Sequence, residues 1–258
     1  MDLGIKGKKA IVCAASRGLG FGCAEKLAEA GVDLVICART PGPLEDAAEK
    51  LRGYGVAVTA IATDITTAEG QAEVLSAAGE VDILVNNAGG PPPGHWSDWD
   101  RDDFIAALDA NMLTPIMLTK AVLPGMMDRG WGRIVNITSQ SVKAPIPVLG
   151  LSNAARTGLT GYVAGTARDV APSGVTMNNI LPGIHATDRA DSLDKAVVDA
   201  KGITMDEART QRQATIPARR YGTQEEFGAM CAFLCSQHAG FIVGQNILLD
   251  GGGVNTTL

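Results

Sequence analysis

The sequence of 258 residues predicts one α/β domain, a doubly wound parallel β-sheet with helices on both faces. Short apolar runs alternate with amphipathic stretches along most of the chain, which is the pattern of repeated strand–helix–strand units. Apolar residues make up 46% of the chain and charged residues 19%, as in a globular protein with a large core. No linker, repeat or low-complexity segment divides it, so we expect a single domain over residues 1–258.

Seven short apolar runs predict the strands of this sheet. Most of them are apolar over several consecutive positions, which is typical of parallel strands that are buried on both faces. Right-handed connections between such strands give a doubly wound sheet. The expected strands are Lys9–Ala15, Val32–Ala38, Val56–Ile61, Val81–Asn86, Arg133–Thr138, Val175–Leu181 and Asn246–Leu249.

Six longer stretches predict the helices that connect these strands, because their apolar residues recur at helical spacing. Pro115 is expected to bend the fourth helix, since proline lacks the N–H that a helix interior uses. One charge-rich stretch, Gly183–Arg220, shows no regular pattern, and we expect an irregular lid loop on the substrate side there. The expected helices are Leu19–Ala30, Leu44–Arg52, Thr67–Ala78, Asp102–Met127, Gly150–Val170 and Gln224–Ser236.

The composition excludes several classes of partner. The net charge is −6, and no basic stripe that would bind nucleic acid is present. No apolar stretch approaches the ~20 residues of a membrane helix. The apolar run before Arg17 is too short for a secretory signal. We therefore expect a cytoplasmic protein that binds neither a membrane nor nucleic acid.

The cysteines indicate a reducing environment. Their odd number, five, argues against a disulfide framework in a chain of this length. All lie inside apolar runs, which predicts buried thiols. Cys231 and Cys235 share a helix face, but no second pair of ligands accompanies them, so we expect no metal site. The five are Cys13, Cys23, Cys37, Cys231 and Cys235.

A glycine-bearing turn follows the first predicted strand, in the run Ser16-Arg17-Gly18-Leu19-Gly20. Such a turn lets backbone N–H groups at a helix N-terminus approach a phosphate, although a tight turn with close helix packing gives the same pattern. Three stretches later in the chain accompany it: Asn86-Asn87-Ala88-Gly89, Pro182-Gly183, and Gly244-Gln245 followed by Asp250-Gly251-Gly252. Together, in order and spacing, they resemble the short-chain dehydrogenase/reductase family over nearly the whole chain. The resemblance implies a Rossmann-like domain that binds a nicotinamide dinucleotide at the carboxyl ends of the strands.

The resemblance also implies site residues. The family's phosphate turn matches Ser16, Arg17, Gly18 and Leu19, and the pair beside the adenine matches Asp64 and Ile65. The segment along the adenosine ribose matches Asn86, Asn87, Ala88 and Gly89, and the segment that holds the nicotinamide matches Pro182, Gly183, Ile184 and Thr187. The helix asparagine of the proton relay matches Asn111, and the catalytic serine matches Ser139.

The sequence departs from the family at the turn and at the catalytic pair. Ala14 replaces the first glycine of the turn, and a Cβ there costs on the order of 1 kcal/mol if φ is positive. Where the family has tyrosine and, four residues later, lysine, this chain has Ser152 and Arg156. The positive charge is kept and the acidic phenol is lost, so the usual proton relay cannot operate unchanged. Two alternatives remain open: Ser152 is only a helix N-cap, and Arg156 is only a clamp on the cofactor ribose.

Two histidines are candidates for the missing proton donor. His95, next to Trp96, lies in the loop that resembles the family's substrate-side wall, and His185 follows Gly183 beside the expected nicotinamide. The alternative for each histidine is a solvated loop residue, and Trp96 fits either packing or a pocket wall. His238 is expected at the surface.

The end of the second predicted strand predicts NADP(H) rather than NAD(H). An acidic residue at this place binds the ribose 2′-hydroxyl and repels a 2′-phosphate, and the sequence has none there. Arg39 and Arg17 offer charge-assisted donors to that phosphate. The alternative is a solvated Arg39 that stacks on the adenine.

These observations predict an NADP-dependent oxidoreductase that reduces a small carbonyl compound, 3-oxoacyl-like or another ketone, through a non-standard active site. Two alternatives remain open. One is a non-redox enzyme of retro-aldol, isomerase or dehydratase type, in which Ser139, Ser152 and Arg156 stabilise an enolate. The other is a nucleotide-binding sensor without turnover. The resemblance further implies a homo-oligomer, a tetramer.

Overall fold

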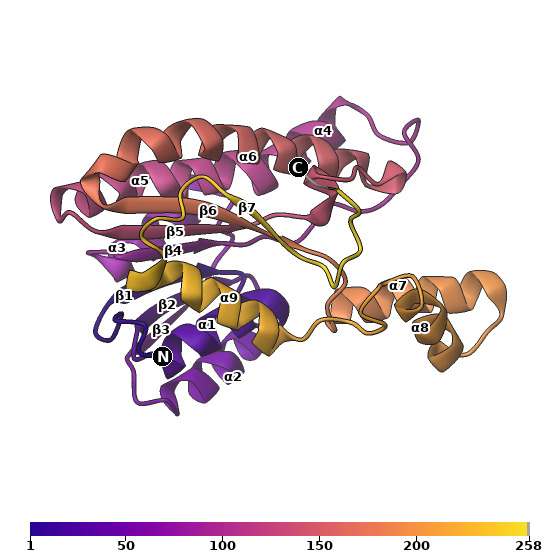
Figure 1. Ribbon diagram of the computed structural model, residues 1–258, viewed down its shortest axis with the longest axis horizontal. Helices are drawn as coiled ribbons and strands as arrows, with labels where there is room; N and C mark the ends of the chain where they lie inside the picture. Colours follow the sequence, from indigo (N-terminus) through magenta and orange to yellow (C-terminus); the bar gives the residue numbers. More distant parts are fainter. Residues whose placement is uncertain (257–258) are drawn as a thin grey trace.

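The computed structural model describes residues 1–256 and confirms the predicted fold class. In this part of the chain seven parallel strands form one sheet in the order β3-β2-β1-β4-β5-β6-β7 (Figure 1). The strand order reverses between β1 and β4, which is where ligands bind in open sheets of this kind. The strands are β1 (Lys9–Cys13), β2 (Asp33–Ala38), β3 (Val58–Ala62), β4 (Ile83–Asn86), β5 (Gly132–Ile137), β6 (Val175–Pro182) and β7 (Asn246–Leu249).

Helices cover both faces of the sheet (Figure 1). On one face α1, α2 and α9 pack on an apolar cluster that includes Val12 and Ile36, and on the other α3, α5 and α6 pack on a cluster that includes Ile11 and Val35. Successive strand residues point to opposite faces, so strands buried on both faces need continuous apolar runs. These helices are α1 (Gly18–Glu29), α2 (Pro41–Arg52), α3 (Ala68–Ala78), α5 (Thr114–Asp128), α6 (Gly150–Val170) and α9 (Gln224–Cys235), and α4 (Arg101–Leu108) precedes α5 in the chain.

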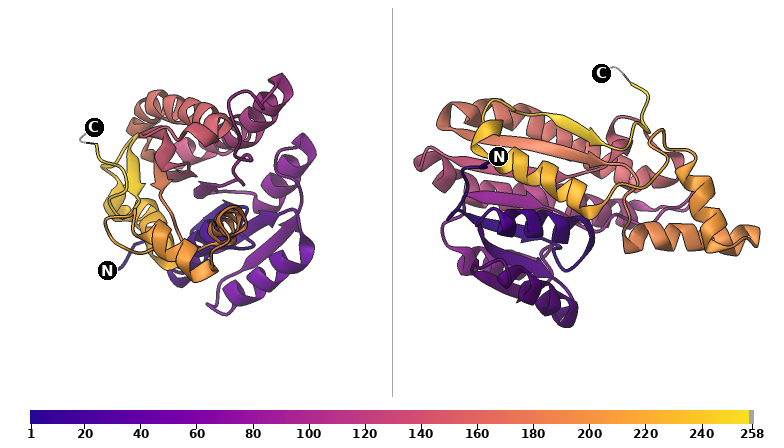
Figure 2. Two further views of the ribbon diagram at one scale, coloured as in Figure 1. Left: turned by 90° about the vertical axis from the view of Figure 1, so that its right-hand side faces the viewer. Right: turned by 60° about the horizontal axis from the view of Figure 1, so that its bottom comes forward.

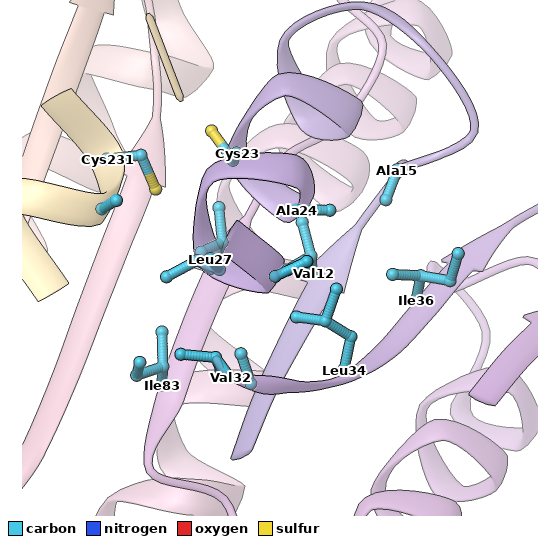
Figure 3. Packing of buried hydrophobic residues seen from close by; sticks show 14 of the residues in the cluster. Val12, Ala15, Cys23, Ala24, Leu27, Val32, Leu34, Ile36, Ile83 and Cys231 are labelled. Carbon is cyan, nitrogen blue, oxygen red and sulfur yellow. The ribbon is translucent and has the colours of Figure 1, made fainter. Parts of the chain in front are cut away.

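The contact between α1 and α9 fixes the start of α1 against the sheet. A Cβ on Gly228 of α9 would lie 2.1 Å from the carbonyl oxygen of Gly22 of α1, so the two helix backbones touch. Leu27 of α1 packs over the strands in the same apolar cluster, and Cys23 of α1 lies beside Cys231 of α9 (Figure 3). All five cysteines are buried and free, which confirms the prediction of buried thiols.

The predicted irregular lid over Gly183–Arg220 is wrong in its structure, because this stretch contains the two helices α7 (Asp188–Lys201) and α8 (Met205–Gln213). They project beyond the carboxyl ends of the strands (Figures 1 and 2). Each starts at a threonine N-cap: the Thr187 hydroxyl accepts a hydrogen bond from the Ala190 N–H, and Thr204 forms a capping box with Glu207. These helices are mostly polar, so caps rather than apolar spacing mark them in the sequence.

The predicted bend in the fourth helix is replaced by a π-helical turn at Asp109–Leu113, immediately before Pro115. Pro115 has no N–H to donate to the carbonyl of Asn111, and the turn accommodates this gap. The resulting helical run, Arg101–Asp128, spans 28 residues and is long and apolar enough to cross a membrane by length and composition alone. This corrects the expectation that no stretch reaches that length. The core helix of a soluble protein passes the same test of length and composition. In Arg101–Asp128, 39% of the most apolar 18-residue part is buried inside the protein.

Candidate active site

A cavity of about 650 Å³ lies at the carboxyl ends of the central strands, beside the first turn of α7. Its walls come from five segments that the sequence singled out: the turn after β1, the segment after β4, the residues after β5, the start of α6, and the start of Gly183–Arg220, the segment named the lid. Of the predicted site residues, those that line it are Arg17, Gly18, Leu19, Asn87, Ala88, Gly89, Ser139, Ser152, Arg156, Pro182, Gly183, Ile184, His185 and Thr187.

The turn after β1 leads into a helix start whose N–H groups face no side-chain cap. Arg17 is the N-cap of α1, no side chain caps the helix, and its first turn contains no acidic residue. The N–H groups at this helix start are therefore available to an anion from the cavity, where the helix dipole also favours negative charge. Gly20 allows close packing, because a Cβ there would lie 2.3 Å from the carbonyl oxygen of Ala14. The turn therefore fits the phosphates of a dinucleotide.

Ala14 adopts the conformation that makes its replacement of glycine costly. Its φ is +49°, in the left-handed region, where a Cβ costs on the order of 1 kcal/mol relative to glycine. The Asn87 side-chain amide donates a hydrogen bond of 3.3 Å to the Ala14 carbonyl and ties the turn to the segment after β4. The alanine therefore keeps the shape of the turn.

The Ser139 hydroxyl follows β5 and faces the cavity. Its oxygen accepts a hydrogen bond of 3.1 Å from the Ser141 N–H, so its own O–H is available to a ligand. Ser152 and Arg156 lie one turn apart on α6, and the Arg156 Nε donates to the Ser152 Oγ at 3.2 Å. Ser152 lies inside α6, whose N-cap is Leu149, so the alternative that Ser152 is an N-cap is wrong.

Arg156 carries a buried positive charge. It is 7% exposed, and burial, with a smaller contribution from the charge of Arg189, lowers its pKa to about 10. The guanidinium therefore stays protonated at neutral pH. Its Nη1 donates to the Ile137 carbonyl at 2.7 Å and its Nη2 to the Ala88 carbonyl at 3.4 Å. In the part of the chain that the structure describes, it forms no ion pair with a carboxylate.

His185 is buried, not solvated, and lines the cavity. Its ring packs edge-on against Phe227, with 5.2 Å between the ring centroids, and lies 3.5 Å from the Gly183 carbonyl through Nδ1. Burial lowers its pKa below the ordinary value, so the imidazole is neutral at pH 7. A neutral imidazole is a weak acid, which weighs against His185 as the main proton donor.

His95 and Trp96 lie outside this cavity. Trp96 is 77% exposed, and His95 is exposed and paired with the Ser97 hydroxyl at 2.8 Å. The loop points them to solvent in this structure, so the alternative of a solvated loop residue describes His95. The predicted surface position of His238 is confirmed, since that residue is exposed as well.

Four residues expected near the adenine end of the cofactor, Ser16, Arg39, Asp64 and Ile65, do not line the cavity, whereas Asn87, Ala88 and Gly89 of the expected ribose segment do. Arg39 is exposed just after β2. The Asp64 carboxylate accepts hydrogen bonds from the N–H and hydroxyl of Thr66, and these lower its pKa. Ser16 and Ile65 are half-buried near these positions. Neither Arg39 nor Asp64 lines the cavity that contains Ser139, Ser152 and Arg156.

Asn86 and Asn111 are buried in the framework behind the cavity. Asn86 starts a line of side-chain amides across β4 to β7, in which it donates to Asn136, Asn136 to Asn179, and Asn179 to Asn246, at 2.8, 3.1 and 2.7 Å. Asn111 sits in the π-helical turn, where its amide donates to the Ala107 carbonyl at 3.4 Å. The amide line therefore links β4, β5, β6 and β7 to one another.

Sequence reasoning missed the charged residues that α7 and α8 bring to the cavity. Asp188 pairs with Arg17 at 2.7 Å and joins the lid to the phosphate turn. Arg189 and Arg212 also line the cavity. Because Asp188 and Arg189 follow the predicted Thr187 directly, recognition of its N-cap would have pointed to them.

Comparisons with known proteins agree with this geometry. A family model described as enoyl-(acyl carrier protein) reductase matches residues 13–253. Acetoacetyl-CoA reductase from Cupriavidus necator is 40% identical over 187 residues, 70% of this chain and 69% of that protein. The 3-oxoacyl-acyl-carrier-protein reductase FabG from Vibrio cholerae is 35% identical over 256 residues, 97% of this chain and 98% of that protein. The crystal structure of L-sorbose reductase from Gluconobacter frateurii, complexed with NADPH and L-sorbose, is 29% identical, has a TM-score of 0.94, and matches 99% of this chain and 100% of that one. The chain therefore belongs to the short-chain dehydrogenase/reductase family of oxidoreductases, as its motifs predict.

Proposed function

We propose that this protein uses NADPH to reduce the carbonyl group of a small molecule, through an active site built on Ser139, Ser152 and Arg156. One observation carries the proposal: two hydroxyls and a buried, unpaired guanidinium line the same cavity as the expected nicotinamide segment at Gly183. The relatives named as acetoacetyl-CoA and 3-oxoacyl reductases favour a 3-oxoacyl-like or other ketone substrate.

The residues around the cavity fit a nicotinamide dinucleotide. The uncapped start of α1 would hold the pyrophosphate, Ala88 and Gly89 the adenosine ribose, and the segment from Pro182 to Thr187 the nicotinamide. When bound, the cofactor supplies a hydride. NADPH is favoured over NADH because β2 ends without an acidic residue and Arg39, exposed just after β2, offers a positive charge to a 2′-phosphate.

The hydroxyls and the guanidinium would stabilise the oxygen of the reacting carbonyl. Arg156 donates to the Ser152 oxygen, which leaves the Ser152 O–H to donate elsewhere and makes it a stronger donor. Ser139 offers a second O–H. Negative charge would develop on the carbonyl oxygen during reduction, and the buried positive charge of Arg156 beside Ser152 would lower its energy.

The proton that completes the alcohol has no phenol to come from, since no tyrosine of the described residues lines the cavity. We assign its last transfer to the Ser152 hydroxyl, which regains a proton from water. His185 is neutral at pH 7 and takes no direct part in this scheme. The relay is slower than one through a phenol, because a serine hydroxyl is a much weaker acid.

The test is NADPH consumption, followed by absorbance, over a panel of 2-, 3- and 4-oxo compounds, with NADH in parallel. We expect stoichiometric alcohol formation with at least one 3-oxo compound and a preference for NADPH of about tenfold or more. NADH used as well as NADPH would refute the cofactor assignment. Product formation without NADPH consumption would instead support a non-redox lyase or isomerase, and cofactor binding without any product would support a sensor.

We also propose that the protein works as a cytoplasmic homotetramer. The helical run Arg101–Asp128 exposes Ile105, Leu113 and Met117, each at 40% or more, which is unusual for large apolar side chains on a free surface. Phe241, just before β7, is fully exposed. Light scattering at micromolar concentration should give about four times the 26.7 kDa chain mass. A species of one chain mass would contradict this assignment.

A further inference from the structure

Four arginines line the cavity. Two of them form ion pairs with aspartates, and the other two do not. Arg17 is paired with Asp188 at 2.7 Å, and Arg212 is paired with the buried Asp194 at 2.9 Å. Within residues 1–256, Arg156 and Arg189 form no ion pair. The cavity wall therefore carries two positive charges without a counterion in the protein.

The two unpaired guanidinium groups both donate to carbonyls of the segment after β4. Arg156, from α6, donates to the Ala88 carbonyl. Arg189, from the first turn of α7, donates to the Pro91 carbonyl at 3.4 Å and lies against Gly90, where a Cβ would be 2.3 Å from its Nη1. The positive charge of Arg189 contributes to the lowered pKa of Arg156, as expected for two like charges facing one cavity.

Such an arrangement is unfavourable without an anion. The charge of Arg156 is buried, which is costly without a partner, and although Arg189 is exposed, the two positive charges repel each other. The Arg156 guanidinium has five N–H groups, and three of them are used by Ser152, Ile137 and Ala88. Two remain, one on each terminal nitrogen, and both are available to donate to an anion.

We propose that the substrate carries a carboxylate close to its reacting carbonyl, and that Arg156 and Arg189 together hold this carboxylate. The proposal rests on the carbonyl reductase function above and names its substrate class, an oxo acid. Phosphates of the cofactor are the other source of negative charge in the cavity. They belong at the start of α1 beside Arg17, whereas Arg156 lies beside Ser152 on α6.

The first experiment compares each oxo acid with its methyl ester: pyruvate, acetoacetate and levulinate against methyl pyruvate, methyl acetoacetate and methyl levulinate. Within a pair the carbonyl is the same and only the charge differs. We expect kcat/KM to favour the acid by about tenfold or more in at least one pair, the size of a lost charge-assisted hydrogen bond. In Arg156→Met and in Arg189→Met this acid-to-ester ratio should fall at least fivefold.

Arg17→Met is the matched control, because it also removes one positive charge from the cavity wall. It should weaken NADPH binding, measured by fluorescence titration, and leave the acid-to-ester ratio within a factor of two. If the Arg156 and Arg189 variants instead weaken NADPH binding and keep the ratio, both arginines serve the cofactor phosphates and the proposal is wrong. Esters reduced as well as acids by the unchanged protein would also overturn it, while the reductase function would stand.

The second experiment does not depend on turnover. Calorimetry with NADP⁺ present compares 3-hydroxybutyrate, a product-like carboxylate, with its methyl ester. We expect the acid to bind at least tenfold more tightly than the ester, and Arg189→Met, an exposed lid variant that should fold normally, to remove that preference. Arg156→Lys, which keeps the charge, should retain part of it. If no oxo compound is reduced but the acid still binds in this pattern, the proposed function fails and the anion site stands; equal binding of acid and ester refutes the site.

Discussion

The arginines of the lid and of the cavity wall differ in how their charge is neutralised. On the lid, Arg212 meets Asp194, a carboxylate with 0% exposed side chain. The Tyr221 hydroxyl also donates to Asp194, with distances of 2.9 and 3.0 Å to its two carboxylate oxygens. On the cavity wall, Arg156 has only carbonyls and a serine hydroxyl around it. The lid cluster of Arg212, Asp194 and Tyr221 therefore has its charges paired within the protein. Arg156 has no anionic partner in the described chain, so a bound ligand has to supply one.

This contrast separates a structural ion cluster from a binding group. A buried charge that has all its partners within the protein holds elements together, and here it joins α7, α8 and the segment that ends at Tyr221 over a small apolar cluster of Ala190 and Ile216. A buried charge without its opposite raises the energy of the free protein and so increases the advantage of binding an anion. The lid cluster thus positions Arg189, and the wall supplies Arg156.

The largest effect is expected from breaking the lid cluster. Asp194→Ala leaves a buried phenol and a partly buried guanidinium without their acceptor, which costs about 3–5 kcal/mol locally. We expect faster hydrogen exchange throughout α7 and α8 and a raised KM, with little change in the exchange of β1 and β4. Asp194→Asn, which keeps one acceptor oxygen, is the control and should show a smaller change. Unaltered exchange in α7 and α8 would mean that the cluster does not hold the lid.

Removing the unpaired charge tests the other side of the comparison. Arg156→Met should lower kcat/KM for the best carbonyl substrate roughly a hundredfold, because the developing oxyanion loses its fixed positive charge. This corresponds to an increase of about 3 kcal/mol in the activation free energy. Unfolding by urea should show little loss of stability or even a gain, since a costly buried charge disappears. Steady-state kinetics and urea unfolding of the same preparation measure both. Full activity with unchanged cofactor affinity would contradict the role assigned to Arg156.

The lid cluster should also make stability depend on pH in the alkaline range. Burial first, and then the hydrogen bond to Asp194, raise the pKa of Tyr221 from 10 to about 12. The folded state therefore favours the neutral phenol, so this contribution is fully present below pH 10 and is lost as the pH rises through 12. We expect a loss of about 1–2 kcal/mol in the free energy of unfolding between pH 9 and pH 12 that is absent in Tyr221→Phe. Urea unfolding of both proteins across this range is the measurement, and parallel pH curves would contradict it.

The same contrast shows what could be read from the sequence. The strands and the phosphate turn are determined locally, by continuous apolar runs and by glycines such as Gly18 that need a positive φ. The lid helices have few apolar residues, so their only local signals are caps, such as Thr204 with Glu207. Whether a loop histidine such as His95 faces a cavity depends on how its loop folds back, which no short-range pattern fixes.

Sequence reasoning could not predict which arginines of the site have a carboxylate partner. Arg156 and Arg212 are both arginines on helices, and nothing in their neighbouring residues shows that one has a carboxylate partner and the other has none. The carboxylate of Asp194 lies 18 residues from Arg212, on a different helix. The difference becomes visible only when α6, α7 and α8 are placed around one cavity.

The smallest effect on kcat/KM is expected at Ser152, and its variants test how Ser152 and Arg156 act together. Ser152→Ala removes one neutral donor that a water molecule can replace. The activation free energy should therefore rise by about 1 kcal/mol, and kcat/KM should fall roughly fivefold. The double variant Ser152→Tyr with Arg156→Lys supplies the phenol and ammonium of related enzymes, but the ring fills space that the substrate or a water uses. It should therefore not increase the rate with the native substrate. Kinetics of the three proteins on one carbonyl compound decide the matter: a much faster double variant would mean that the serine–arginine pair is a weakened form of the usual site, whereas a slow one supports an arrangement adapted to an anionic substrate.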